Sequence, residues 1–210
     1  MAAWYLQEYH NIVGMNLDID HPLGAPPADA LEGLGHVRML YNVSLNPNYP
    51  VSDPQRRYGN TDLDYTFSRY YPHIKRYTDA GLRVILVFTH QTYGEGREEF
   101  WPWHAMTTDK WQRLSEAFST IVADTAQRFK DMNLVYQIWN EMDAPVGAAA
   151  SVPMLAEDYA IILRDAVQKV READPAATII TGGSISGPMG SKYLWDKAER
   201  PEGCRHDRRR

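Results

Sequence analysis

The chain has 210 residues, of which 44% are hydrophobic and 23% are charged, a composition typical of one large globular domain or part of one. Its net charge of −5 gives no sign of nucleic-acid binding, and no apolar stretch of the sequence is long enough to span a bilayer. The single cysteine, Cys204, excludes an internal disulfide framework.

Strand and helix signals alternate along the chain. Short runs rich in β-forming residues predict strands at residues 11–17, 36–43, 83–90, 134–139 and 178–181. Apolar residues at helical spacing predict helices at residues 27–34, from Thr61 onward, from Thr108 onward, and at 154–173. Such alternation indicates a parallel sheet covered by helices.

The helix that begins at Thr61 has the clearest pattern. Its apolar residues recur every three or four positions, at Leu63, Phe67, Tyr70, Ile74 and Tyr77. Gly81 suits the position just after a helix end, where a left-handed backbone is needed. Pro72 lies inside the pattern and predicts a kink.

Polar residues collect where the predicted strands end. They are Asn16, Asp18, Asn42, His90, Asn140, Glu141 and Thr181. The first strand is followed by the run from Asp18 to Pro22 and not by the Gly-rich phosphate turn of a doubly wound sheet. The fold class is therefore α/β, of the (β/α)8 TIM-barrel type, whose active site lies at the C-terminal ends of the strands. The barrel is incomplete, because about five β/α units are visible and no strand signal follows Gly183.

The two ends of the sequence carry little information. Residues 205–210 contain four Arg and one Asp. We expect one partial barrel domain at residues 1–200 and a basic tail at 201–210 that is disordered or artefactual. No signal peptide is visible at the N-terminus, so localisation stays open: the sequence reads as cytoplasmic as written, and a secreted full-length form is also compatible with it.

Residues on three of the predicted strands carry a resemblance to a known family. Asn140-Glu141 follows the fourth strand, Arg38 lies inside the second, and His90 ends the third. In this order and spacing, over residues 10–190, the chain resembles the clan A glycoside hydrolases, retaining barrel enzymes that include cellulases, mannanases and xylosidases. The resemblance implies that Glu141 is the acid/base carboxylate and that Asn140 binds a sugar 2-hydroxyl. It also implies that Arg38 lies near the nucleophile and that His90 lines the −1 subsite.

Retaining glycosidases need an environment that keeps the acid protonated, which this sequence provides, and a second carboxyl group as nucleophile, which it does not provide. The acid must stay protonated near neutral pH, which needs an apolar or negatively charged neighbourhood, and Trp139 beside Glu141 suits the first. A second carboxyl group about 5–5.5 Å away must act as nucleophile. The resemblance places it after a seventh strand, which this sequence does not contain. We therefore expect a C-terminally truncated chain that is inactive alone.

Further substrate contacts are predicted on the strand ends and in the aromatic loop. Trp101 and Trp103 can stack on sugar rings, Asn16 can reach a sugar hydroxyl, and Trp139 is a further predicted substrate contact. Each candidate also has a structural alternative. Glu141 can cap a helix, Arg38 can form a buried ion pair, His90 can be a core histidine, and the two tryptophans can simply pack the loop.

Three functions remain open on the sequence alone. The first is a glycoside hydrolase that acts on β-linked oligo- or polysaccharides without a cofactor. The second is a carbohydrate-binding or decayed chain that lacks hydrolysis. The third is a barrel enzyme that holds a divalent metal with Asp18, His90, Glu141 and Asp143, although no short ligand spacing favours a metal. No nucleic-acid or membrane partner is expected, and the sequence specifies neither the glycan nor the oligomeric state.

Overall fold

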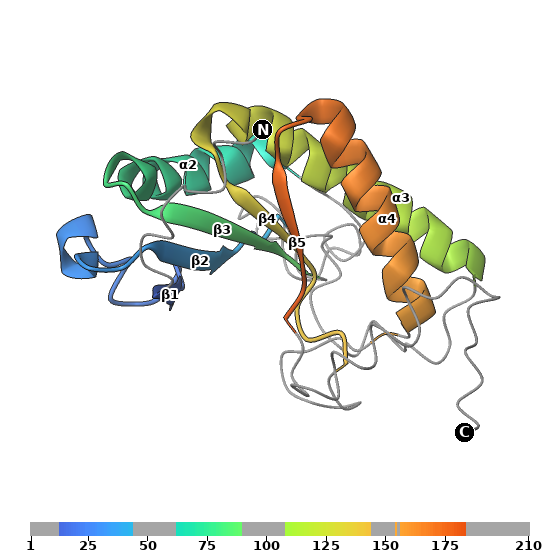
Figure 1. The fold of residues 1–210 in the computed structure, drawn as a ribbon, viewed down its shortest axis with the longest axis horizontal. Coiled ribbons are helices and arrows are strands. Elements are labelled where there is room, and N and C mark those ends of the chain that lie inside the picture. Colours follow the sequence, from blue (N-terminus) through green and yellow to red (C-terminus); the bar gives the residue numbers. More distant parts are fainter. Residues whose placement is uncertain (1–12, 44–61, 90–107, 144–153, 155, 184–210) are drawn as a thin grey trace, which may run out of the picture.

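The computed structural model of the chain describes residues 13–43, 62–89, 108–143, 154 and 156–183. Its elements, shown in Figure 1, are β1 (Gly14–Leu17), η2 (Ala28–Leu31), β2 (His36–Leu40), α2 (Leu63–Asp79), β3 (Arg83–Phe88), α3 (Thr108–Phe129), η6 (Lys130–Met132), β4 (Val135–Ile138), α4 (Ala156–Ala173) and β5 (Thr178–Thr181).

The five strands form one parallel sheet in the order β1-β2-β3-β4-β5, so neighbours in the sheet are also neighbours along the chain. The helices α2, α3 and α4 lie on the same side of this sheet, and α3 packs along α4 (Figure 1). Strands in chain order with their crossover helices on one side are the arrangement of the first five units of a (β/α)8 barrel. The prediction of an incomplete α/β barrel is confirmed.

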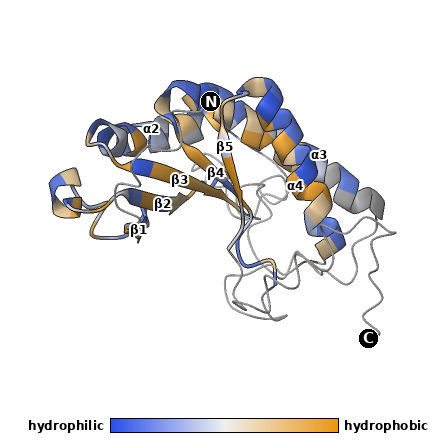
Figure 2. Ribbon diagram, in the orientation of Figure 1, coloured by the Kyte–Doolittle hydropathy of each residue, from blue (hydrophilic) through white to orange (hydrophobic). Residues whose placement is uncertain are grey.

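The hydrophobic core lies between the sheet and its helices. Alternation along each strand sends every second side chain toward the helices, and Figure 2 shows the strands as largely hydrophobic and the helices as mixed. The side chains buried on this face of the sheet include Val37, Met39, Val84, Leu86, Phe88, Tyr136 and Ile138. On the opposite face, which a closed barrel would turn inward, Leu40 is 40% exposed and Ile180 38%.

The predicted helix after Thr61 begins two residues later, because Asp62 is its N-cap. The Asp62 carboxylate accepts a hydrogen bond from the Tyr65 amide at 2.8 Å, which satisfies one of the free amides of the first turn. Pro72 lies inside the helix, as predicted. Gly81 has φ +82° just after the helix end, so its predicted role there is confirmed.

Several predicted ends were wrong by a few residues, and each has a local cause. The strand predicted at 36–43 ends at Leu40, because the Asn42 amide donates to the Tyr70 hydroxyl at 3.0 Å instead of continuing the ladder. The helix predicted at 27–34 is only the single 3-10 turn η2, and the chain leaves it before Gly33, which has φ +86°.

Parts of the sequence predictions lie outside the described residues. These are the strand positions 11, 12 and 90, and the basic tail at 201–210. The domain boundary near residue 200 stays a prediction. Within the described part of the chain, no helix combines the length and the apolar character needed to cross a bilayer.

Candidate active site

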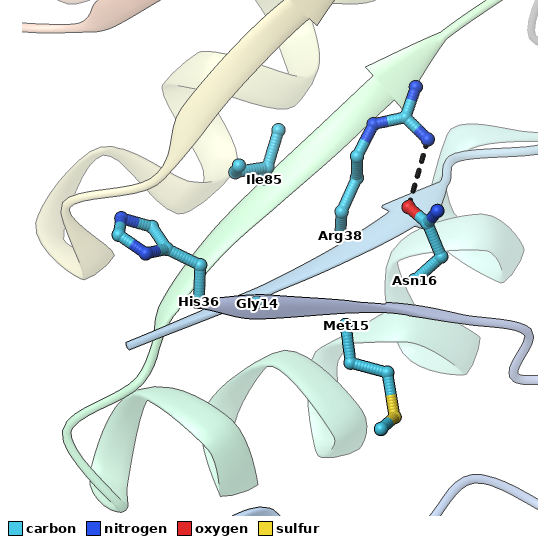
Figure 3. Close-up of a pocket in the computed structure, with 6 residues that line it drawn as sticks. All are labelled: Gly14, Met15, Asn16, His36, Arg38 and Ile85. Atoms are coloured by element: carbon cyan, nitrogen blue, oxygen red, sulfur yellow. Dashed lines mark hydrogen bonds between the residues drawn. The ribbon is translucent and has the colours of Figure 1, made fainter. Parts of the chain in front are cut away.

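Arg38 is the centre of a polar cluster at the C-terminal end of the sheet. Its side chain leaves the middle of β2 on the face away from the helices. It donates three hydrogen bonds to amide oxygens on three sides: to Asn16 Oδ1 at 3.0 Å, to Gln137 Oε1 at 2.9 Å and to Asn140 Oδ1 at 2.6 Å. Figure 3 shows the bond to Asn16, which comes from β1. Side chains from β1, β2 and the end of β4 therefore meet at one guanidinium.

The charged group that acts on Arg38 is Glu141, whereas the three hydrogen-bond partners named above are uncharged amides. Burial lowers the pKa of Arg38, and the nearby Glu141 carboxylate opposes that effect. Glu141 is itself partly buried. The structure thus brings together the predicted residues Asn16, Arg38, Asn140 and Glu141.

The backbone at the end of β4 is turned so that these side chains can meet. Trp139 has φ +68° and Glu141 has φ +51°, so two left-handed residues flank Asn140. This conformation is uncommon for residues other than glycine and is held here by hydrogen bonds on both sides. The Trp139 amide donates to the Phe88 carbonyl at 2.7 Å, and the Glu141 amide donates to the Gly183 carbonyl at 2.8 Å. We call residues 139–141 the β4 turn.

The end of β5 supports the β4 turn from the other side. A Cβ placed on Gly182 would lie 2.8 Å from the Trp139 carbonyl oxygen, so only glycine allows this close approach. The buried Tyr159 hydroxyl, from α4, donates to the Ile138 carbonyl at 2.9 Å and accepts from the Gly182 amide at 3.0 Å. Tyr159 therefore ties the ends of β4 and β5 together.

Trp139 is placed differently from the sequence prediction. Its side chain is 0% exposed, and its ring lies 5.7 Å from the ring of Phe118 on α3. The left-handed φ of Trp139 turns this ring into the core between the sheet and the helices. We therefore assign Trp139 no direct contact with a substrate.

Two cavities lie near the Arg38 cluster, the first over the N-terminal halves of β1, β2 and β3 and the second at the C-terminal ends of β1 and β2. One, of about 330 Å³, is lined by Gly14, Met15, Asn16, His36, Arg38 and Ile85 (Figure 3). The other, of about 310 Å³, lies at the ends of β1 and β2 and includes Asp18, Asp20 and Tyr70 in its wall. Asp20 also forms an ion pair with Arg69 of α2. The Arg38 cluster borders the first of these open spaces.

Three of the predicted site residues, His90, Trp101 and Trp103, lie outside the described residues. Among the residues whose positions the structure gives, no group of three His, Cys, Asp or Glu side chains is arranged to hold a metal ion. The four proposed metal ligands included His90, so the metal alternative has no support from the remaining three.

Sequence reasoning missed three residues that organise the site: Gln137, Tyr159 and Gly182. Gln137 had a signal, since it is the one polar residue in the apolar run of β4. Gly182 stands in a Gly pair after β5, which marked a turn but not a close approach. Tyr159 fitted a helix core pattern, and nothing in that pattern indicates where its hydroxyl goes.

Comparison with solved structures gives the same fold. The chain is similar to a GH5-4 broad specificity endoglucanase from Clostridium acetobutylicum, with TM-score 0.57, 18% identity and coverage of 82% of this chain and 54% of that one. It is also similar to a glycoside hydrolase family 5 enzyme from Prevotella bryantii B14, with TM-score 0.54 and 20% identity. That match covers 80% of this chain and 54% of the Prevotella chain. A third similar structure is ZgEngAGH5_4 in complex with a cellotriose, with TM-score 0.51 and 16% identity. That match covers 80% of this chain and 53% of the other.

These likenesses are limited in extent. The chain spans about half the length of those structures, and identities this low carry the fold alone. No curated protein matches the chain. A family model does match it, over residues 32–204, and that range includes Arg38, Asn140 and Glu141. The chain belongs to the cellulase family, glycosyl hydrolase family 5.

Proposed function

We propose that this chain carries the acid/base half of a retaining glycoside hydrolase site that acts on β-linked oligo- or polysaccharides. The observation that supports it best is the cluster of Arg38, Asn140 and Glu141 at the C-terminal end of a parallel sheet, within the stretch matched by the cellulase family. A solved relative of the same fold holds a cellotriose, which favours a β-glucan-like substrate.

In this proposal Glu141 gives its proton to the glycosidic oxygen and later takes one from water. Asn140 binds the sugar. Its Oδ1 accepts from Arg38 at 2.6 Å, so its amide NH₂ points the other way and is the donor offered to a hydroxyl. Asn16 is held by Arg38 in the same manner and lies beside the cavity of about 330 Å³.

The nucleophile is the second half of the site. Double displacement needs a carboxylate about 5–5.5 Å from the acid, on the other face of the sugar. We propose that none of the described strand ends supplies it. His90 as part of the −1 subsite, and Trp101 and Trp103 as stacking platforms, remain part of the proposal on the strength of the sequence.

The second candidate function is carbohydrate binding without hydrolysis. It is favoured by the sequence of the described strand ends, in which no second Glu follows a strand as Glu141 follows β4. In a complete retaining site, a second carboxylate is expected nearby.

The test is to incubate a full-length form of the protein, which adds the nucleophile half of the site to this chain, with cello-oligosaccharides and with an activated aryl β-cellobioside, and to follow the product anomer by NMR. We expect hydrolysis with retention from the full-length form and none from the chain alone. Glu141→Gln should lose about 10²–10⁴-fold on the oligosaccharide and much less on the aryl substrate, which needs little acid help. Glu116→Gln, an exposed carboxylate on α3, is the control and should change neither rate.

The outcomes separate the two functions. Equal loss of Glu141→Gln on both substrates would argue against the acid role. Oligosaccharide binding without turnover by the full-length form, abolished by Asn140→Ala, would favour the binding function. Activity that needs a metal and is lost on chelation would contradict both.

A further inference from the structure

Gln137 is a buried amide whose two ends are both in use. It lies in β4 on the face away from the helices, with 5% of its side chain exposed. Its Oε1 accepts from Arg38 Nε at 2.9 Å, and its Nε2 donates to the Trp139 carbonyl at 2.9 Å. One side chain thus connects the guanidinium at the centre of the cluster to the backbone of the β4 turn.

Only a glutamine amide can make both bonds from this position. A glutamate has the same shape but no donor, so it would face the Trp139 carbonyl with a second oxygen. A methionine has similar length but neither group. Because the site is buried, a lost partner leaves a polar group that water does not reach. The orientation of the Gln137 amide is fixed by its neighbours. The Arg38 guanidinium can only donate, so Oε1 faces it, and the Trp139 carbonyl can only accept, so Nε2 faces that group.

These two bonds set the geometry of the residues that face the substrate. The Nε bond fixes the plane of the Arg38 guanidinium, which in turn fixes Asn140 through a bond of 2.6 Å. The carbonyl bond holds Trp139 in its left-handed conformation, and Glu141 follows two residues later. Asn140 and Glu141 are therefore constrained from the side-chain end and from the backbone end by the same amide.

The neutrality of Gln137 matters as well. Every hydrogen-bond acceptor of Arg38 is an uncharged amide, so the guanidinium keeps its charge for Glu141. A carboxylate at position 137 would sit on the Nε side and neutralise that charge inside the cluster.

We propose that Gln137 is a positioning residue of the active site: its amide aligns Arg38 and the β4 turn together and leaves the charge of Arg38 to act on Glu141. The inference rests on the proposed function for the meaning of that alignment, but the alignment itself can be measured on the full chain without any turnover.

The test compares Gln137→Met and Gln137→Glu with the wild-type chain by NMR, using Gln168→Met as the control because Gln168 lies exposed on α4. The Arg38 Nε–H resonance is assigned from its loss in Arg38→Lys. In Gln137→Met its hydrogen exchange should speed up by about tenfold, the factor expected for one lost hydrogen bond of ordinary strength. In Gln137→Glu it should stay protected, because a carboxylate still accepts. The backbone amides of Asn140 and Glu141 should shift in both variants.

Two results would overturn the inference. One is unchanged Arg38 Nε–H exchange in a folded Gln137→Met chain. The other is an unshifted Glu141 amide in Gln137→Glu, which matches the wild-type side chain in shape and decides the matter if the methionine variant fails to fold. Gln168→Met should leave both signals as they are in the wild-type chain.

The kcat of the full-length protein on two substrates gives a second test, because a purely structural residue would affect both substrates equally. On a substrate with a poor leaving group, Gln137→Met should lower kcat by on the order of 100-fold, the effect of a small misplacement of a reacting group. The loss on an activated aryl substrate should be clearly smaller, and an equal loss on both would reduce Gln137 to a structural residue. A full-length wild-type protein without turnover would count against the proposed function, while the NMR comparison on this chain would still decide the role of Gln137.

Discussion

The β4 turn places Glu141 in the site by means of an unfavourable backbone conformation that several hydrogen bonds hold in place. A left-handed backbone costs an L-residue about 1–2 kcal/mol, and here Trp139 and Glu141 both adopt it. The peptide groups around Trp139 are fixed by bonds to Phe88 and Gln137, and that of Glu141 by a bond to Gly183. The turn is therefore determined by its surroundings and not by local preference.

Gly182 offers a residue-scale test of this support. Gly182→Ala places a methyl group 2.8 Å from the Trp139 carbonyl oxygen and 2.9 Å from its carbon, so the turn must shift. We expect the free energy of unfolding to fall by about 1–3 kcal/mol, as for other overpacked sites. Gly183→Ala is the matched control, because a Cβ there meets nothing within 4 Å. Urea unfolding of both variants measures the difference, and equal stabilities would contradict the close approach.

Some residues of the site could be predicted from the sequence pattern, and others could not because their roles depend on contacts between individual atoms. Arg38 and Asn140 are 102 positions apart, yet the sequence brings them together, because parallel strands end at the same edge of a sheet. The roles of Gln137 and Gly182 depend on which atoms come within about 3 Å, and no periodicity carries that information. The orientation of the Trp139 ring toward Phe118 depends on the left-handed backbone of the β4 turn, which no periodicity indicates.

At the scale of elements, Tyr159 joins three of them. It comes from α4, and its hydroxyl bridges the backbone of β4 and β5 where each strand ends. Beyond the ladder, which stops at Ile138 and Thr181, the Tyr159 bridge adds to the bond between the Glu141 amide and the Gly183 carbonyl.

Tyr159→Phe removes only this bridge. It leaves the Ile138 carbonyl and the Gly182 amide without their partner in a buried place, so we expect a loss of about 1–3 kcal/mol in the free energy of unfolding. Tyr71→Phe, a ring at the surface of α2, should change stability by less than about 0.5 kcal/mol. Thermal and urea unfolding of the pair measure this, and a neutral Tyr159→Phe would show that the bridge contributes little.

Element types were predictable, and their ends less so. The spacing of apolar residues gave all five strands and the three long helices, because one face of each must pack against the core. The ends depend on tertiary partners, as with Asn42, whose amide leaves the ladder for the Tyr70 hydroxyl. Such a partner lies 28 residues away and is invisible to a local pattern.

At the scale of the whole molecule, four buried tyrosines link stability to pH. Burial raises the pKa of Tyr70 and Tyr159 to about 12, from an ordinary value of 10.0. Burial also raises the pKa of Tyr41 and of Tyr136. The folded chain therefore keeps these hydroxyls protonated at a pH where the unfolded chain ionises them.

The stability that comes from these groups is fully present below pH 10 and is lost as the pH rises toward 12. Each unit of pKa difference is worth about 1.4 kcal/mol, so we expect the free energy of unfolding to drop by several kcal/mol across this range. Urea unfolding from about pH 8 upward measures the drop. Tyr159→Phe should make it shallower, and a pH-independent stability would contradict the prediction.

The face of the sheet against which none of the described helices packs has a consequence for association. Leu40 and Ile180 lie on this face and are 40% and 38% exposed. Apolar side chains on an open sheet face favour self-association. We expect light scattering on a sizing column to detect oligomers that Leu40→Ser with Ile180→Thr reduces. Leu23→Ser, at a 90% exposed position in a turn, should have no such effect, and a monodisperse wild-type monomer would contradict this expectation.

The order of the strands also bears on how the chain can assemble in time. Each described strand pairs with the described strand made just before it, so no pairing among them waits for a strand made later. Each parallel pair still has to close its crossover connection, and the loop entropy of that closure opposes the pairing. As the polypeptide leaves the ribosome, the sheet can grow one strand at a time from β1, and Arg38 is in place before its partners on β4 are made.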